Sequence, residues 1–405
     1  MDLVPYAVPF FLLAILVEYL YGRSRGHDTY RLNDSINSLS LGVLSTSTKL
    51  LGLNIGGVVF ASASALAPLS LDPVSPWTWL AALLLYDFCY YWFHRISHER
   101  TLLWASHVAH HQSEEFNLTT ALRQTSTGFL LGWVFYIPCF LAGIPASVFV
   151  TVASAHLIYQ FWIHSRHIPK LGPLEWVLVT ASNHRVHHAQ NPAYVDRNYG
   201  GLLIVWDRLF GTFAEERAEE PCVYGILGPL RSWNPLWANL HIYAGMLRDA
   251  WHTGSGVDRL RVLVSRTGWR PADVARRFPV HKVPLAGFRR FDPAFTRGVG
   301  VYAALQFLVA VVLALWVQET GNGWPMLHLW GAYGYLLLSL FAIGRLLERG
   351  AEGRRAEWLR LLAVVLVALW ACMAGVAGPG VAVAASLYAF VSGVALLFVR
   401  GGSPG

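Results

Sequence analysis

Residues 83–98 run Leu83-Leu-Leu-Tyr-Asp-Phe-Cys-Tyr-Tyr-Trp-Phe-His-Arg-Ile-Ser-His98 and join two features that bear on the whole chain. Most of the stretch is apolar, and its last five residues place two histidines four positions apart. An apolar run of about 20 residues can cross a bilayer as a helix, and fewer suffice when flanking side chains reach the interface. The run 77–93 therefore predicts a membrane span that ends directly at an H-x-x-x-H motif.

The composition of the remaining chain agrees with a membrane protein. Hydrophobic residues make up 55% of the 405 residues and charged residues 14%, against about 45–50% and about 25% in soluble domains. Four dispersed cysteines exclude a disulfide framework. The net charge of +7 could indicate a nucleic-acid partner, but the basic loops of a membrane protein would also explain it. Because the composition favours a membrane protein, no nucleic-acid partner is expected.

Nine apolar runs are candidate spans, which predicts an all-α, polytopic membrane protein. The second is long and contains four glycines, so we expect it to be tilted or broken. The first lacks a basic segment before it and a cleavage site after it, which favours a retained helix over a signal peptide. The nine runs are 4–21, 38–67, 77–93, 127–146, 147–163, 298–317, 325–344, 357–376 and 380–399.

The charges between these runs predict an orientation. The segments 68–76, 143–145, 318–324 and 377–379 contain no lysine or arginine, whereas the alternate segments are rich in arginine. Basic residues are retained in the cytoplasm, which places the amino terminus outside and the carboxyl terminus inside. Lys49 is the exception, with snorkelling, a buried partner or a lipid headgroup as open explanations.

This topology predicts two regions and a cellular location. Residues 1–297 form a membrane domain with a cytoplasmic cap at about 94–125 and 164–296, and residues 298–405 form a four-helix membrane region without a motif. Three lysines against 28 arginines indicate a GC-rich bacterial genome. We therefore expect the plasma membrane of a bacterium, with the cap on the cytoplasmic side.

The histidines form short clusters at helical spacing. The first motif is H-x-x-x-H, two later ones are H-x-x-H-H, and a further histidine follows the fifth run. Residues three or four apart share one face of a helix, so each cluster projects its imidazoles into one region. The candidate metal ligands are His94, His98, His107, His110, His111, His164, His184, His187 and His188.

Neutral imidazole binds iron, zinc and copper well. Nine such side chains exceed the three or four that one zinc site uses, so they indicate two ions held side by side. His167, three residues after His164, is a further candidate. His156 lies inside a span, where packing is favoured over a ligand role.

Several longer stretches carry a resemblance to a known family. They are 107–124, 159–164, 171–175, 184–188 and 198–213, for example Asn198-Tyr-Gly-Gly-Leu-Leu-Ile-Val-Trp-Asp-Arg-Leu-Phe-Gly-Thr-Phe213. Over about 77–245 the chain resembles the membrane fatty acid hydroxylase/sterol desaturase superfamily, most closely its alkylglycerol-cleaving monooxygenases. The resemblance implies that the eight motif histidines bind two iron ions and that His164 corresponds to a further family histidine.

The resemblance also implies an oxygen-dependent lipid monooxygenase that takes its substrate from the bilayer. Its reductant would be tetrahydrobiopterin or a redox protein. Glu99 matches a glutamate of these enzymes and is the candidate catalytic residue, although pairing with Arg95 or Arg100 on one helix face is an equal alternative. Glu99 is also a candidate to orient the imidazoles, together with Asp87, Glu114 and Glu115.

Two other functions stay open at this point. The nearer is a sterol, carotenoid or fatty acid hydroxylase or desaturase with the same metal site. The more distant is a metal transporter or a haem electron carrier. Transport would require ligands at mid-membrane depth, whereas these clusters all follow the ends of spans.

Overall fold

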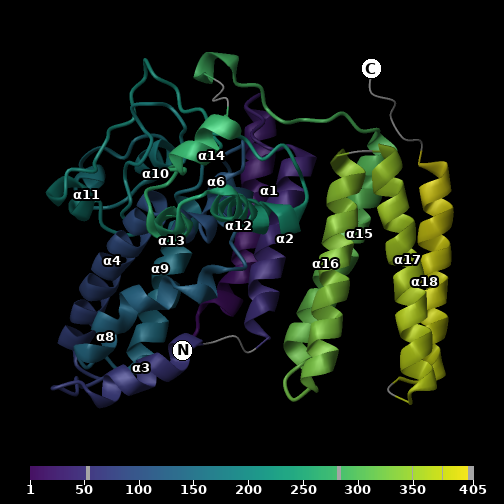
Figure 1. Cartoon of the computed structure of the whole chain (residues 1–405). Helices are drawn as coiled ribbons and strands as arrows, with labels where there is room; N and C mark the ends of the chain where they lie inside the picture. The colour runs from purple at the N-terminus through teal and green to yellow at the C-terminus, as the bar shows by residue number, and fades with distance from the viewer. Residues whose placement is uncertain (52–54, 281–283, 349, 376, 400–405) are drawn as a thin grey trace. The chain divides into compact units, whose positions relative to one another are not determined.

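The computed structural model consists of helices joined by turns and loops (Figure 1). It describes residues 1–51, 55–280, 284–348, 350–375 and 377–399. Within these residues no strand forms, and extended backbone pairs only in three isolated bridges. The expected all-α class is thus confirmed for the described part. The chain divides into two compact units.

The first unit comprises Met1–Arg31, Leu53–Leu230 and Asn239–Arg289. In its membrane-type part, Pro76 lies in the first turn of its helix, where the missing N–H costs no hydrogen bond. That helix, α4, packs against α8 and α9 around Ala82, Cys89, Phe140 and Val148. The helices of this part are α1 (Val4–Ser24), α3 (Ile55–Ala65), α4 (Pro76–Glu99), the short α8 (Ile137–Leu141) and α9 (Ala146–Trp162).

The rest of this unit is made of short helices and loops. Two helix starts near the histidine motifs are fixed locally, since Thr119 N–H donates to Asn117 Oδ1 and Thr180 N–H donates to Asn183 Oδ1. The short helices are α5 (Thr101–Ala105), α6 (Val108–His111), α7 (Leu118–Ala121), η1 (Gly128–Leu130), η2 (Gly132–Tyr136), η3 (Gly172–Trp176), α10 (Ala181–His187), α11 (Val205–Leu209), α13 (Gly256–Val264), α14 (Ala272–Arg277) and η4 (Leu285–Gly287). The longer α12 covers Pro235–His252.

The second unit comprises Leu32–Gly52, Arg231–Ala238 and Arg290–Gly405. Its C-terminal part begins close to the predicted boundary at 297, and it also includes residues 32–52 and 231–238, which the sequence assigned to the first domain. Asn37 donates to the carbonyl of Trp233 at 2.8 Å, and Thr48 bonds the hydroxyl of Tyr333 at 2.9 Å. Its long helices are α2 (Leu32–Lys49), α15 (Arg297–Thr320), α16 (Met326–Glu348), α17 (Gly350–Met373) and α18 (Pro379–Phe398).

A buried polar network ties the C-terminal helices of this unit together. Arg360 of α17 is 1% exposed and donates to both carboxylate oxygens of Glu357, at 2.9 and 2.6 Å. It also bonds Gln306 of α15, Tyr335 of α16 and Tyr388 of α18 at 2.8–3.0 Å. A buried charge is tolerated when it is paired and fully hydrogen-bonded, and these bonds meet that condition.

Within the described residues, five helices are long and apolar enough to cross a membrane, and the expected number of nine spans stays a prediction. They are α1, α15, α16, α18 and Ala351–Met373 of α17. The run 38–67, expected to be tilted or broken, contains the end of α2 at Lys49 and the start of α3 at Ile55, and residues 52–54 between them lie outside the described part. The predicted span 127–146 is wrong as one helix, because η1, η2 and α8 are short helices separated near Gly128, Gly132 and Pro138.

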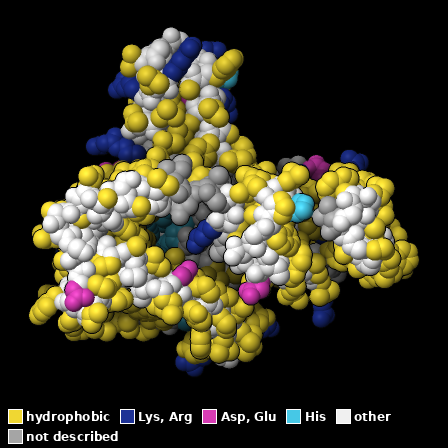
Figure 2. Space-filling model, turned by 90° about the horizontal axis from the view of Figure 1, so that it is seen from below, with side chains coloured by type: hydrophobic (Ala, Val, Ile, Leu, Met, Phe, Trp, Pro, Cys, Tyr) yellow, Lys and Arg dark blue, Asp and Glu magenta, His cyan; other side chains and the backbone are white. Residues whose placement is uncertain are grey.

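The surface of the units fits a lipid environment. Hydrophobic side chains predominate on the face seen in Figure 2, and charged side chains are sparse between them. On α1, Phe10, Leu12 and Leu13 are 70%, 55% and 58% exposed. Such continuous exposed apolar surface is unusual for a protein in water.

Candidate metal centre

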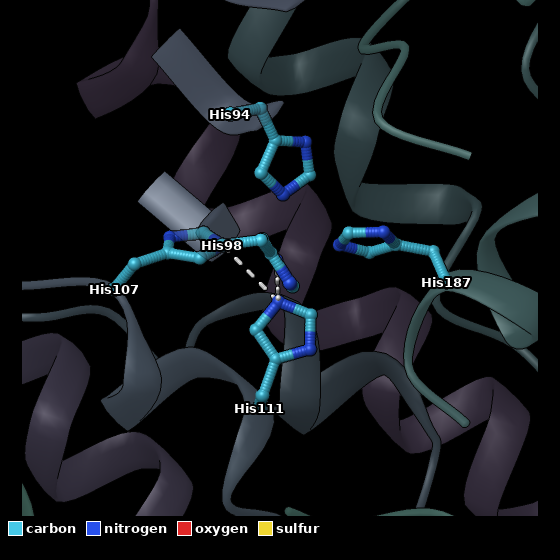
Figure 3. Close-up of side chains that lie close together, drawn as sticks. All are labelled: His94, His98, His107, His111 and His187. Atoms are coloured by element: carbon cyan, nitrogen blue, oxygen red, sulfur yellow. Dashed lines mark hydrogen bonds between the residues drawn. The ribbon is translucent and has the colours of Figure 1, made fainter. Parts of the chain in front are cut away.

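Nine histidine side chains of the first unit converge in two adjoining groups. Within each group the candidate ligand atoms all lie within 4.8 Å of one another. The five rings of the first group surround one common space in Figure 3. The first group is His94, His98, His107, His111 and His187, and the second is His110, His164, His184 and His188. The structure thus brings together all nine histidines that were predicted from the sequence as metal ligands.

Each H-x-x-H-H motif contributes to both groups. On α6 and its N-cap, His107 and His111 enter the first group while His110 enters the second. The α10 motif does the reverse, since His187 enters the first group and its two neighbours enter the second. The two groups therefore share the same two motifs and lie side by side. The rings of His111, in the first group, and His188, in the second, stack with centroids 4.3 Å apart.

Backbone carbonyls fix the orientation of four rings, two in each group. In the first group, Nδ1 of His94 lies 2.8 Å from the carbonyl oxygen of Tyr199, and Nδ1 of His187 lies 2.9 Å from that of Arg197. In the second group, two further Nδ1 atoms each lie 2.8 Å from carbonyl oxygens, those of Arg123 and Gln160. A carbonyl only accepts, so each Nδ1 carries the proton and each Nε2 carries a lone pair.

These lone pairs point at one another. Nε2 of His110 and Nε2 of His164 are 3.3 Å apart, although both rings donate from Nδ1. Neither nitrogen has a proton to share in the neutral ring, so the contact is repulsive unless a cation lies between or beside them. In the first group, Nε2 of His94 and of His187 are buried and have no hydrogen-bond partner in the described chain. Buried polar atoms without partners are costly, and a metal ion would satisfy them.

Burial favours the neutral form of eight of the nine rings by lowering their pKa values, and neutral imidazole is the form that metal binding requires. Burial lowers the pKa of His110 to about 4. Burial, and next the neighbouring imidazoles, lower the pKa values of His107, His111, His184 and His188 well below the ordinary value, which is about 6.5. Neutral imidazole is the ligand form, so no proton needs to be displaced at pH 7.

Aromatic side chains enclose the groups. Phe116 is fully buried, stacks on His164 at 5.5 Å between centroids, and packs against His188 at 5.2 Å. Tyr224 stacks on Phe116 with ring centroids 4.9 Å apart. Beside the first group, the ring of Trp104 lies 5.0 Å from that of His98. This apolar lining lowers the local dielectric and limits access of water.

A buried carboxylate holds the loop that orients His94. Asp207 of α11 accepts N–H bonds from Tyr199 and Gly200 and an O–H bond from Thr212, each at 2.7 Å. Asp207 is fully buried. The same loop contains Asp196, whose Oδ1 lies 3.5 Å from Nδ1 of His98. Neither Asp196 nor Asp207 is predicted as a site residue from the sequence, where the available signal was the asparagine- and glycine-containing segment after His188.

Two of the carboxylates expected to orient the rings, those of Asp87 and Glu115, bond other groups. Asp87 accepts from His156 Nε2 at 2.7 Å and from Trp206 Nε1 at 2.8 Å, so it does not bond the grouped histidines. Glu115 bonds Arg31 at 2.8 Å. Glu114 is buried close to Gly225. Backbone carbonyl oxygens orient four of the rings, and no sequence motif predicts these carbonyls.

Glu99 pairs with Arg95 at 2.9 Å along one face of α4 and belongs to neither histidine group. The ion pair on the helix face is therefore present, and a catalytic role for Glu99 stays a prediction.

His156 and His167 also lie outside both groups. His156 is buried and bonds Asp87, which agrees with the expected packing role. His167 lies near Thr29, with 3.5 Å between Nε2 and Oγ1. Lys49 is the last residue of α2 and its side chain is exposed, so its charge does not require a buried partner.

Comparison with known proteins identifies the family. Residues 79–212, which include all nine histidines, match the family model for fatty acid hydroxylase. The alkylglycerol monooxygenase of Xenopus tropicalis is 34% identical over 365 residues, covering 89% of this chain and 81% of that protein. That of Homo sapiens is 35% identical over 374 residues, covering 90% and 82%. An ornithine lipid hydroxylase of Rhizobium tropici is 29% identical over 154 residues, covering 36% and 44%.

No solved structure shows a significant match. The similarity to the two vertebrate proteins extends well beyond 77–245, the region in which the motifs carried the resemblance. The chain therefore belongs to the fatty acid hydroxylase superfamily, in the family of the alkylglycerol monooxygenases.

Proposed function

We propose that this membrane protein is an oxygen-dependent monooxygenase that holds one iron ion in each histidine group and cleaves the ether bond of alkylglycerol lipids. Family membership supports oxidation of a lipid. The observation that carries the metal centre is the approach of two unprotonated Nε2 atoms, those of His110 and His164, to 3.3 Å. A cation held by imidazoles accounts for this geometry, and a purely structural histidine pair does not.

The donor set fits iron. The groups offer five and four imidazole nitrogen ligands without a thiolate, and imidazole suits divalent iron. When bound, the two ions would supply the activation of dioxygen. The protein orients the ligands through the carbonyls of Tyr199, Arg197, Arg123 and Gln160. Phe116 limits access of water to the second group.

The proposed reaction inserts one oxygen atom of dioxygen into the C–H bond next to the ether oxygen. The other oxygen atom leaves as water, which requires two electrons and two protons from a reductant. The hydroxylated carbon is a hemiacetal, which collapses to a fatty aldehyde and a glycerol derivative. The reductant is proposed to be tetrahydrobiopterin or a redox protein.

A second candidate is hydroxylation without cleavage. The similarity to an ornithine lipid hydroxylase over 154 residues favours keeping this alternative. It would use the same metal centre on a lipid without an ether bond at the oxidised carbon, and the product would keep its new hydroxyl group. A sterol, carotenoid or fatty acid as substrate belongs to the same alternative.

We further propose that the histidine groups face the cytoplasm. Arg23 lies in the last turn of α1, and Arg95 and Arg100 flank the end of α4 that bears His94 and His98. Basic residues at this end support a cytoplasmic location. The vertebrate origin of the long-range matches gives no support to a bacterial plasma membrane, which rests on arginine usage alone.

Product analysis tests the proposal. The purified full-length protein, loaded anaerobically with ferrous iron, receives oxygen, a reduced pterin and one of three lipids: an alkylglycerol, a fatty acid or a sterol. We expect oxygen consumption with the alkylglycerol and release of a fatty aldehyde, detected by mass spectrometry. Retention of a hydroxyl group on an intact lipid would favour the second candidate. The assay is repeated with a reduced ferredoxin in place of the pterin, and absence of oxygen consumption with every lipid and both reductants would contradict both candidates.

A further inference from the structure

The first unit contains a polar cavity of about 350 Å³ outside the histidine groups. Small-molecule sites commonly enclose about 300–1,000 Å³, so a headgroup-sized ligand fits. Two of the six lining side chains are guanidinium groups, two are imidazoles, and none of the six is a carboxylate. The lining residues are Tyr21, Arg25, His27, Thr29, Arg166 and His167.

The two walls of the cavity are fixed to each other. One wall is the end of α1 with the loop after it, and the other is the segment that contains His167. A Cβ atom on Gly22 would lie 3.0 Å from His167 Nε2, so the absence of a side chain there permits the close approach. The ring of His167 meets the edge of Tyr21 at 5.3 Å, and Asn117 donates to the carbonyl of Thr29 at 2.6 Å. The cavity is therefore largely preformed, which lowers the entropic cost of binding.

The charge around the cavity is positive. The buried carboxylate of Glu115 lies 2.8 Å from Arg31 and 3.9 Å from Arg166, so its contact with Arg31 is much closer than its contact with the cavity arginine Arg166. Within the described residues Arg25 makes no ion pair, and its guanidinium lies over the ring of Tyr21 at 5.8 Å. Arginine is the side chain best suited to a phosphate group, which it can bind through two parallel hydrogen bonds.

The other acidic groups nearby have partners. Glu18 accepts from the hydroxyl groups of Tyr30 and Ser165 and from the N–H of Leu118. Asp28 is exposed and lies 4.0 Å from Arg23. These contacts leave the two cavity arginines as the dominant charges facing the space.

The end of α1 does not repel an anion strongly. The carbonyl of Tyr21 accepts the N–H of Arg25 at 3.0 Å, and the carbonyl of Gly22 accepts the N–H of His27 at 2.9 Å. These bonds use carbonyls that would otherwise present the negative end of the helix dipole.

The position of the cavity indicates the source of the anion. The helix α1 is long and apolar enough to cross a membrane, and Arg25 follows it directly. The cavity thus lies at the level where a span ends and lipid headgroups begin. We propose that it binds the phosphate of a membrane phospholipid headgroup. Arg166, two residues after His164, lies over the ring of Tyr224 at 5.9 Å, so the bound headgroup would lie beside the second histidine group.

Binding to the purified full-length protein in detergent tests this site without any activity assay. Three probes are compared by calorimetry: a short-chain phosphatidic acid, the matching diacylglycerol without phosphate, and inorganic phosphate. We expect saturable binding of phosphatidic acid alone. Arg25→Gln and Arg166→Gln should each weaken it about tenfold or more, because a hydrogen bond to a charged group contributes about 1.5–3 kcal/mol. The control is Arg261→Gln, whose exposed side chain on α13 is not part of the cavity lining.

Three results would overturn the proposal. Equal binding of diacylglycerol would show that the phosphate is not recognised. Equal or tighter binding of inorganic phosphate would assign the cavity to a soluble ligand. Unchanged affinity in Arg25→Gln would remove the cavity from the binding event. Arg25 is exposed and unpaired within the described chain, so this variant keeps the test valid even if Arg166→Gln, which loses its contact with Glu115, folds poorly.

Discussion

The substitution Asp207→Asn tests how the protein orients its ligands from a distance. Asp207 touches none of the nine histidines in the bonds described, but it holds Tyr199 and Gly200 through two N–H bonds of 2.7 Å. Asparagine keeps one acceptor oxygen and turns an amide N–H₂ toward the N–H of Gly200. One charge-assisted bond is lost and a buried donor is left without an acceptor, for a cost of about 3 kcal/mol in the free energy of unfolding.

The metal should respond through His94. The carbonyl of Tyr199 accepts the Nδ1 proton of His94, so displacement of the loop releases that ring from its orientation. Loss of a group that orients a ligand typically lowers metal affinity 10–100-fold. The assay is competition for ferrous iron with a calibrated chelator under anaerobic conditions at pH 7.5. Burial raises the pKa of Asp207 to about 6, so the wild-type carboxylate is ionised at that pH.

A matched control separates orientation from stability. Asp249 is also buried, and it pairs with Arg270 at 2.6 and 2.8 Å instead of holding the loop of Tyr199. Asp249→Asn should destabilise the protein by a similar amount and leave iron affinity unchanged. If Asp207→Asn lowered thermal stability but matched the control in iron affinity, the proposed orientation of His94 through Tyr199 would be wrong.

Further predictions concern the ligands, the second unit and the metal itself. His110→Ala and His187→Ala should each lower iron content and abolish lipid oxidation, measured by metal analysis and oxygen uptake, whereas His252→Ala should change neither, since that ring bonds a carbonyl of its own helix. Arg360→Met should lower the thermal midpoint strongly, because a buried charge pair that loses one partner costs about 3–5 kcal/mol, while the double replacement of Arg360 and Glu357 by Met should recover most of the loss. Chelation of iron should lower the thermal midpoint of the wild type, and a midpoint unaffected by chelation would count against a structural contribution of the ions.

The sequence predicted the histidines well because their signal is local. Spacings of three and four residues fix which side chains share a helix face, and His94 with His98 follow that rule within α4. The division of each H-x-x-H-H motif between two groups could not be predicted. His110 and His187 each belong to a different group from the other two histidines of their motif. This division depends on how α6 and α10 pack, and these helices are distant in sequence.

The differences from the sequence-based expectations have both local and tertiary causes. Apolar content alone made 127–146 look like one span, but glycine and proline divide it into short helices. Acidic residues near the motifs looked like partners for the rings, yet Asp87 serves His156 and Glu99 serves Arg95. The acceptors that orient the rings are backbone carbonyl oxygens, which every residue has, so no sequence motif could predict which residues supply them.

The most direct test of the account is the iron content of the full-length protein after anaerobic loading and removal of loosely bound metal. The two histidine groups predict two iron ions per chain in the wild type and fewer in His110→Ala and in His187→Ala. An iron content below one per chain in the wild type, or an unchanged content in both variants, would contradict the claim that these groups form the metal centre.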